Sequence, residues 1–334
     1  MRYLPPSRPK PRRRTKMAGP TAAPVVGPST SGPSGRRELA SARRHRGLGE
    51  TGSSLVLIVP VLILFSISAI YPLFETIRLS FFDIRGMNPA KYVGFGNYLT
   101  LFSDPGFRGT LVTTVIFTLA TTAISVSLGW VLAMLCAFAP RQTAPFRVMI
   151  FMAFGISETV SGYMWISMLR PDQGGLLNAV IGSVIPGFSH AWLGDENTAL
   201  WAIVIAASWS GVGLPLMLCS AAVQSIPRTI LEAAYMDGAK PLSVMRHIMM
   251  PLSIPGVRVS IFINLLGALR AFDIIYVLTG GGPVRSTETV GYFMFRESMT
   301  QFKLGYGAAA TVVLLIAVLV ISLPAIIQRT AGAK

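Results

Sequence analysis

The stretch EAAYMDGAKPLSVMRHIMMP, residues 232–251, lies between two long apolar segments of a 334-residue chain. Acidic and basic side chains occur throughout it, with a glycine at position 238 and a proline at position 251. Glycine adopts backbone turns that a side chain would obstruct, so the stretch is expected to fold as two short helices joined at Gly238. Its polarity places both helices outside a bilayer.

The first of these helices has an apolar stripe made by Ile230, Leu231 and Ala234, with Glu232 and Asp237 off that face. Two short helices held at an angle would form a rigid projection. Such a projection could seat in a groove of a partner and transmit rigid-body motion. The alternative is an ordinary amphipathic loop at the membrane surface.

The second helix is predicted to begin near Pro241, because proline suits the first helical turn. It carries Val244, Met245 and Ile248 at helical spacing. Pro251 and Pro255 are expected to end it before the next apolar segment, since proline lacks the N–H that continues a helix.

The composition places the chain among integral membrane proteins. It is 52% hydrophobic and 13% charged, with a mean hydropathy of +0.58, whereas a soluble domain has about a quarter charged residues. A net charge of +15 raises the possibility of nucleic-acid binding. The basic residues crowd the N-terminus and the loops of one side, which membrane orientation explains, so nucleic acid is not an expected partner.

Apolar runs predict an all-α fold with six membrane-spanning helices, because one crossing needs about 20 mostly apolar residues. The runs are 55–74, 111–138, 148–169, 198–227, 259–279 and 304–328. The third contains Glu158. The fifth contains Arg270 and Asp273, which stand three residues apart on one predicted helix and are close enough to pair.

Lys and Arg residues predict the orientation. Twenty of the 29 lie in segments 1–52, 139–147 and 227–258 or at the C-terminus, and eight lie in the opposite loops. Basic residues favour the cytoplasmic side, so both termini are expected there. The membrane domain is predicted to span 53–330.

Segment 1–52 is rich in Pro, Gly, Ser and Arg and is predicted to be a disordered basic cytoplasmic tail. It lacks the apolar core of a secretory signal. Anionic membrane lipid would attract such a tail. The alternatives are a tail without a role, or a start of the protein at Met17.

The motif in 232–251 reads Glu-Ala-Ala, three residues, Gly238, nine residues, Ile248, one residue, then Met250-Pro251. It resembles the EAA loop of binding-protein-dependent ABC importer permeases, EAA-x3-G-x9-I-x-L-P, with Met250 in place of leucine. The resemblance implies a type I permease fold in a bacterial cell membrane, with a coupling loop at about 227–256. The residues expected at the contact with an ATP-binding subunit are Glu232, Ala233, Ala234, Asp237, Gly238, Ile248 and Pro251.

The same resemblance implies the assembly and its cargo. A second homologous permease, two ATP-binding subunits and an extracytoplasmic solute-binding protein or lipoprotein are the expected partners. Three stretches are similar to maltose-type and glycerol-phosphate-type permeases, which implies a sugar or oligosaccharide cargo. They are YPLFETIRLSFFD with YVGFGNYLTLFSDPGF (71–83 and 92–107), QSIPRTILEAAYMDGA (224–239) and FDIIYVLTGGGPVRSTET (272–289).

Three alternatives remain open at this stage. Importers of polyamine, phosphate, sulfate or amino acids also have EAA-type loops. An ion-coupled secondary transporter would use Glu158, Asp273 and Arg270 as a relay. A membrane sensor or scaffold is the third, although no signalling domain is visible in the sequence.

Polar side chains within membrane spans are costly and usually face a cavity or one another. A sugar is commonly held by hydrogen bonds to its hydroxyls and by an aromatic ring against its apolar face. For each candidate, helix packing or an interfacial position is the alternative. The candidate residues of the substrate path are Glu158, Tyr163, Trp165, Trp209, Ser210, Asn264, Phe272 and Asp273.

No catalytic apparatus is predicted in this chain, so ATP hydrolysis is assigned to separate subunits. GLGETGSS (47–54) approaches a phosphate-binding loop but has Ser53 where lysine is required. The histidines are scattered, and no metal site or bound cofactor is expected. Cys136 and Cys219 lie in apolar runs and are expected to be small buried side chains without a disulfide.

Overall fold

The computed structural model describes residues 58–138 and 142–331, with side chains as far as residue 323. The predicted tail 1–52 and the GLGETGSS segment lie outside these residues. The chain divides into two compact units, Met1–Ser66 and Ile67–Lys334. In the first unit the described residues, 58–66, are helical.

The predicted helical membrane fold is confirmed. Four helices of the described residues are long and apolar enough to cross a membrane, and two further pairs of helices pass the same test together but are bent. The count reaches the predicted six if each bent pair is one crossing. The four helices are Ile58–Leu79, Pro105–Ala137, Pro241–Leu269 and Leu304–Leu323.

A small hairpin departs from the all-helical expectation. Helix α3 (Tyr71–Leu79) leads into strands β1 (Phe82–Asp83) and β2 (Lys91–Tyr92), which pair antiparallel. Helix α4 (Gly96–Ser103) follows. The buried amide of Asn97 donates to the carbonyls of Ser80 and Phe82, at 2.8 and 2.9 Å, and so ties α4 to the hairpin.

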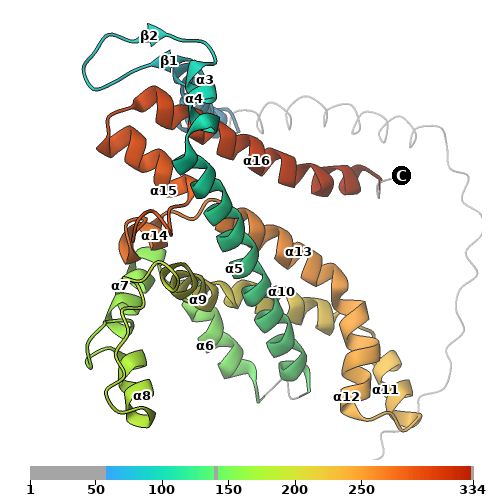
Figure 1. Ribbon diagram of the computed structural model, residues 1–334. Helices are drawn as coiled ribbons and strands as arrows, with labels where there is room; N and C mark the ends of the chain where they lie inside the picture. The colour runs from blue at the N-terminus through green and yellow to red at the C-terminus, as the bar shows by residue number, and fades with distance from the viewer. Residues whose placement is uncertain (1–57, 139–141, 332–334) are drawn as a thin grey trace, which may run out of the picture. The chain divides into compact units, whose positions relative to one another are not determined.

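Three helices pack together in the centre of the second unit: α5 (Pro105–Ala137), α10 (Gly213–Gln224) and α13 (Met250–Leu269) (Figure 1). Small residues at membrane helix interfaces let backbones approach closely. A Cβ at Gly129 of α5 would lie 2.6 Å from Pro215 and 2.8 Å from the backbone nitrogen of Leu216. A Cβ at Gly256 of α13 would lie 2.5 Å from that of Ala222 on α10.

Two predicted spans are bent. Helices α6 (Ala144–Phe154) and α7 (Glu158–Met168) meet at 99°, and α9 (Ala199–Gly211) and α10 meet at 45°. The third predicted span, 148–169, is therefore not one continuous helix, and Glu158 stands at the start of α7. The backbone turns at Gly155 to Ser157, where Ser157 has φ −56° and ψ 138°. Packing of α7 against α14 (Asp273–Leu278) stabilises the orientation of α7 after the bend.

The helix after Gly238 does not end at its prolines, which corrects a second expectation. Helix α12 (Pro241–Val244), the π-helical turn η2 (Met245–Met249) and α13 form one helical segment that continues through Pro251 and Pro255. Pro251 follows the π-helical turn, where the hydrogen-bond pattern has already shifted. Pro255 removes one further bond, a loss that packing against α5 and α10 outweighs.

The expected pairing of Arg270 with Asp273 is also wrong. Helix α13 ends at Leu269 and α14 begins at Asp273, so the two residues do not share a helix. The Nε of Arg270 donates instead to the carbonyl of Leu266 at 3.2 Å.

Asn178 holds the long loop between α7 and α9. This asparagine, in α8 (Leu176–Val184), is fully buried and donates to the carbonyls of Arg170, Pro171 and His190. Its oxygen accepts a bond from the indole of Trp192 at 2.9 Å. At the exposed start of the loop, a hydrogen bond from Arg170 holds the pKa of the Asp172 carboxyl below its ordinary value.

The last elements complete an apolar cluster at the start of α5. They are α15 (Val290–Phe295), the π-helical turn η3 (Arg296–Thr300) and α16 (Leu304–Ala331). Phe107 of α5 and Phe293 of α15 are fully buried there, with ring centroids 5.0 Å apart. Cys136 and Cys219 are buried and free, as expected.

Gly129→Ala tests the close approach of α5 and α10. We expect the free energy of unfolding to fall by about 1–3 kcal/mol, because the added methyl group overlaps the backbone of α10 and both helices must shift. Gly109→Ala in the same helix is the matched control, since its Cβ would meet nothing within 4 Å. The thermal midpoint of unfolding of the purified Gly129→Ala protein should lie below that of Gly109→Ala. Equal midpoints would contradict the close packing of α5 and α10.

Candidate functional site

The turn after α11 (Arg228–Met236) fixes the angle between α11 and α12. The N–H of Gly238 bonds to the carbonyl of Tyr235, and that of Ala239 to the carbonyl of Ala234, both at 3.0 Å. This is the Schellman pattern that ends helices at a left-handed residue, and Gly238 has φ +78°. A Cβ there would meet nothing within 4 Å. The backbone conformation, and not lack of space, is therefore the reason for glycine.

The apolar side of this α11–α12 joint, residues 228–251, packs onto the ends of the central helices. Leu231, Ala234 and Ile248 contact a buried cluster that includes Met134 of α5 and Val223 at the end of α10. The predicted stripe is confirmed for Leu231 and Ala234. Ile230 differs, because 41% of it is exposed.

The opposite side of the joint is open. Of the residues expected to contact an ATP-binding subunit, Ala234 and Ile248 are half-buried in the apolar cluster. The others are exposed: Glu232, Ala233, Asp237, Gly238 and Pro251. The joint thus has one face fixed to the membrane helices and one exposed face, which carries both acidic and basic side chains.

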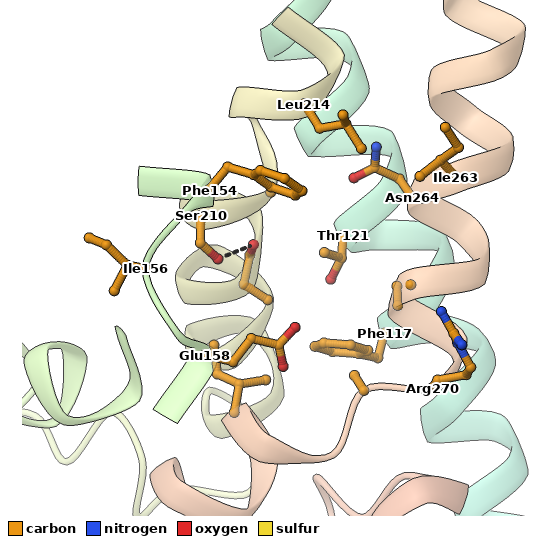
Figure 2. A pocket seen from close by; sticks show the side chains of 16 residues that line it. Phe117, Thr121, Phe154, Ile156, Glu158, Ser210, Leu214, Ile263, Asn264 and Arg270 are labelled. Atoms are coloured by element: carbon orange, nitrogen blue, oxygen red, sulfur yellow. Dashed lines mark hydrogen bonds between the residues drawn. The ribbon is translucent and has the colours of Figure 1, made fainter. Parts of the chain in front are cut away.

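A cavity of about 270 Å³ lies further along the central helices (Figure 2). Its walls come from α5, the bend between α6 and α7, the end of α9, and α13. The residues that line it are Phe117, Thr121, Phe154, Ile156, Glu158, Ala207, Ser210, Gly211, Leu214, Ile263, Asn264, Gly267, Ala268, Arg270, Ala271 and Ile274.

Three of the predicted path residues, Glu158, Ser210 and Asn264, meet at this cavity. Figure 2 shows the carboxylate of Glu158 and the amide of Asn264 directed into it from opposite walls. The Asn264 nitrogen donates to the Ser260 carbonyl at 3.0 Å, which leaves its oxygen to accept a bond. The Ser210 hydroxyl donates to the carbonyl of Ala207 at 3.1 Å. The wall can therefore accept hydrogen bonds from a hydroxylated solute.

The tryptophans and Tyr163 lie elsewhere. Trp165 and Trp209 pack edge to face, with ring centroids 6.3 Å apart, and line a separate apolar cavity of about 520 Å³. Tyr163 is 64% exposed.

Phe272 and Asp273 do not line the 270 Å³ cavity either. The ring of Phe272 stacks on that of Tyr276, with centroids 5.5 Å apart, and packs against Phe295, with centroids 5.0 Å apart. Asp273 is the first residue of α14. The aromatic rings that do line the cavity are Phe117 and Phe154, which the sequence analysis did not select.

Sequence reasoning also missed Thr121. Threonines recur on one face of α5 at 110, 114, 118 and 121, and this helical spacing was the available signal. Thr110 and Thr114 bond to the segment after α14. Thr118 and Thr121 are buried, and neither hydroxyl has a hydrogen-bond partner among the described residues. Thr121 lines the cavity, while its hydroxyl oxygen is itself buried.

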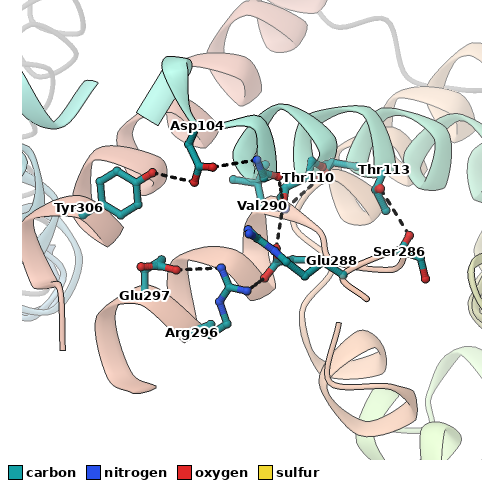
Figure 3. Close-up of polar contacts among 12 residues, drawn as sticks. Asp104, Thr110, Thr113, Ser286, Glu288, Val290, Arg296, Glu297 and Tyr306 are labelled. Atoms are coloured by element: carbon teal, nitrogen blue, oxygen red, sulfur yellow. Dashed lines mark hydrogen bonds and ion pairs between the residues drawn. The ribbon is translucent and has the colours of Figure 1, made fainter. Parts of the chain in front are cut away.

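A buried carboxylate fixes the segment after α14 to α5 (Figure 3). The side chain of Glu288 is 1% exposed and pairs with Arg285 at 2.6 Å and Arg296 at 2.9 Å. It also accepts a bond from Thr110 at 3.0 Å. We call these four residues the Glu288 clamp. The glycines before it form a tight turn, with φ +56° at Gly280 and +80° at Gly281.

Bent spans around a polar cavity, with an exposed helical joint at one end, define a membrane transport subunit. Residues 43–331 match the model of the family described as binding-protein-dependent transport system inner membrane component. The chain belongs to this family. It is a multi-pass inner-membrane permease of an ABC importer that works with a binding protein, and it is not itself an enzyme.

Known proteins agree with this assignment. The chain is 33% identical over 270 residues to the probable ABC transporter permease protein YurN of Bacillus subtilis, covering 80% of this chain and 92% of YurN. It is 30% identical over 281 residues to the sulfoquinovosyl glycerol transport system permease protein SmoG of Agrobacterium fabrum, covering 83% and 90%. A crystal structure of a bacterial ABC transporter involved in the import of the acidic polysaccharide alginate has the same fold, with a TM-score of 0.73 at 19% identity, covering 89% of this chain and 100% of that one.

Glu288→Gln tests the clamp. Neutralising this buried carboxylate leaves Arg285 and Arg296 without their common partner. We therefore expect the free energy of unfolding to fall by about 3 kcal/mol. Glu75→Gln is the control, because Glu75 forms an exposed pair with Arg78 and its loss should change the thermal midpoint little. If both variants melt together, Glu288 does not hold this segment.

Proposed function

We propose that this permease carries a sugar or sugar derivative and that the α11–α12 joint receives the movement of an ATP-binding subunit. It pairs with a second homologous permease. Two ATP-binding subunits dock on the cytoplasmic face, and an extracytoplasmic solute-binding protein or lipoprotein delivers the solute. The observation that carries this proposal is the joint itself, whose apolar side packs on the membrane helices and whose charged side is exposed.

The joint can transmit force because it has no flexible connection to the membrane helices. The Schellman turn sets the angle of α11, and Leu231 and Ala234 seat it on the ends of α5 and α10. Helix α12 continues through η2 into α13 without a break. A push on Glu232 or Asp237 therefore moves the packed helices as a unit, which is the rigid-body type of transition.

The cavity lined by Glu158 and Asn264 is the proposed solute path. It combines the hydrogen-bond acceptors of Glu158 and Asn264 with the rings of Phe117 and Phe154. Hydroxyl groups of a sugar would bond to the polar atoms, and its apolar face would lie against a ring. The name of SmoG, a permease for a sugar glycoside, supports the same cargo class.

The distribution of Lys and Arg supports an orientation in which both termini and the joint are cytoplasmic. The 270 Å³ cavity would then lie between the joint and the extracytoplasmic side. The Glu288 clamp would hold the extracytoplasmic turn against α5, at the end where solute enters.

Gly238→Val tests the joint. The left-handed conformation costs an ordinary residue about 1–2 kcal/mol, and a β-branched residue more, so α11 should shift from its seat. We expect ATP hydrolysis by the assembled importer to lose its coupling to uptake in vesicles. Gly238→Asn is the control, because asparagine tolerates this conformation.

A second variant of the joint, Glu232→Lys, reverses the charge at one exposed position. It should weaken retention of the ATP-binding subunits during purification. Full coupling in both Gly238→Val and Glu232→Lys would refute the role of the joint.

Glu158→Gln tests the solute path. A charged acceptor contributes about 1.5–3 kcal/mol to a hydrogen bond, so we expect the KM of sugar uptake to rise about tenfold or more at equal expression. Glu196→Gln removes an exposed carboxylate of the α8–α9 loop and serves as the control. Unchanged uptake in Glu158→Gln would remove this residue from the path.

A further inference from the structure

Two charged side chains of opposite sign, Glu158 and Arg270, line the cavity of about 270 Å³. Neither forms an ion pair with the other or with any other described residue. Figure 2 shows them on opposite sides of the Phe117 ring. The Nε of Arg270 donates to the carbonyl of Leu266 at 3.2 Å, which orients the guanidinium group. Its two terminal nitrogens have no hydrogen-bond partner in the part of the chain that the structure describes.

The position of Arg270 makes its charge costly. The residue belongs to the predicted apolar run 259–279, where a cation usually meets a cavity or an opposite charge. A guanidinium group cannot reduce this cost by losing its proton. The arginines of the Glu288 clamp differ, because each pairs with a carboxylate of the chain. Arg270 therefore offers donors for an anion that the described residues do not supply.

Gly267 gives a second, independent indication. It lines the same cavity and precedes Arg270 by three residues, so the two lie on one face at the end of α13. A Cβ at Gly267 would meet nothing within 4 Å, whereas at Gly129 and Gly256 a neighbouring helix leaves no room. Glycine weakens a helix interior relative to alanine, so a glycine without a packing contact needs another reason. Here it leaves open space beside the guanidinium group.

We propose that Gly267 and Arg270 form an anion-binding subsite of the solute path, and that the solute is a sugar with an acidic group. The inference rests on the proposed sugar cargo and deepens it by naming the charge of that sugar. A carboxylate or a phosphate group accepts two parallel bonds from a planar guanidinium group. The space at Gly267 would admit such a group to the terminal nitrogens of Arg270.

The two charges of the cavity would also select one orientation of the solute. Hydroxyl groups of the sugar would donate to the carboxylate of Glu158, and the acidic group would turn away from it toward Arg270. A neutral sugar would leave the guanidinium group without an opposite charge. A cationic sugar would pair with Glu158 but would be repelled by Arg270.

The test compares sugars that differ in charge and little in size. The purified importer, with its partner subunits, is titrated in detergent with glucuronate, its neutral amide glucuronamide, glucose 6-phosphate and glucose, and the thermal midpoint reports binding. We expect glucuronate to bind about tenfold more tightly than glucuronamide, since it gains a charge-assisted contact. In Arg270→Gln this preference should disappear. Comparison with glucose 6-phosphate shows whether the subsite prefers a carboxylate or a phosphate group.

Two further variants separate binding from folding. Arg258→Gln removes an exposed cation of α13 outside the cavity and should keep the preference for glucuronate. Gly267→Leu should fold normally, because its Cβ has open space, and should weaken binding of all four sugars by filling that space.

Equal affinity for glucuronate and glucuronamide, or an unchanged preference in Arg270→Gln, would overturn the subsite and leave the sugar path in place. An unchanged preference together with loss of the second permease from the Arg270→Gln importer would show that Arg270 pairs with that subunit instead. Absence of binding by all four sugars would count against the sugar cargo itself, and the subsite would fall with it.

Discussion

The close packing of α5 against α10 and α13 is the constraint on which the rest of the structure depends. Gly129 and Gly256 allow these backbones to approach to distances that a single methyl group would prevent. The hydrophobic effect gives no net drive between helices in lipid, so contact of this kind must hold them. One helix, α5, then contributes Thr110 to the Glu288 clamp, Thr121 to the cavity and Met134 to the seat of the joint.

The polar groups of the membrane region divide into satisfied and unsatisfied ones. Glu288 is almost fully buried and is surrounded by two arginines and a hydroxyl, as a buried charge requires. Thr118 and Thr121 are buried without a partner. Nε of Arg296 and the hydroxyl of Ser286 at the turn after α14 also have no hydrogen-bond partner among the described residues. The ion pairs and the bond from Thr110 nevertheless give Glu288 a structural role.

The sequence by itself determined the class of protein, the turn at Gly238 and the two sides of α11. These depend on local properties: apolar length, the left-handed preference of glycine and helical spacing. Only the tertiary structure decided the course of the helices. Pro251 and Pro255 did not end a helix, because packing against two neighbours outweighed the lost hydrogen bonds.

The tertiary structure also decided which residues meet. Glu158, Ser210 and Asn264 were found from their polarity, and they lie at one cavity because α6 and α7 bend by 99° beside α9 and α13. Trp165 and Trp209 had suitable chemistry and lie elsewhere. Residue type follows from the sequence, whereas the wall a side chain faces depends on helix direction and rotation. Contacts between distant segments set both, and no local pattern encodes them.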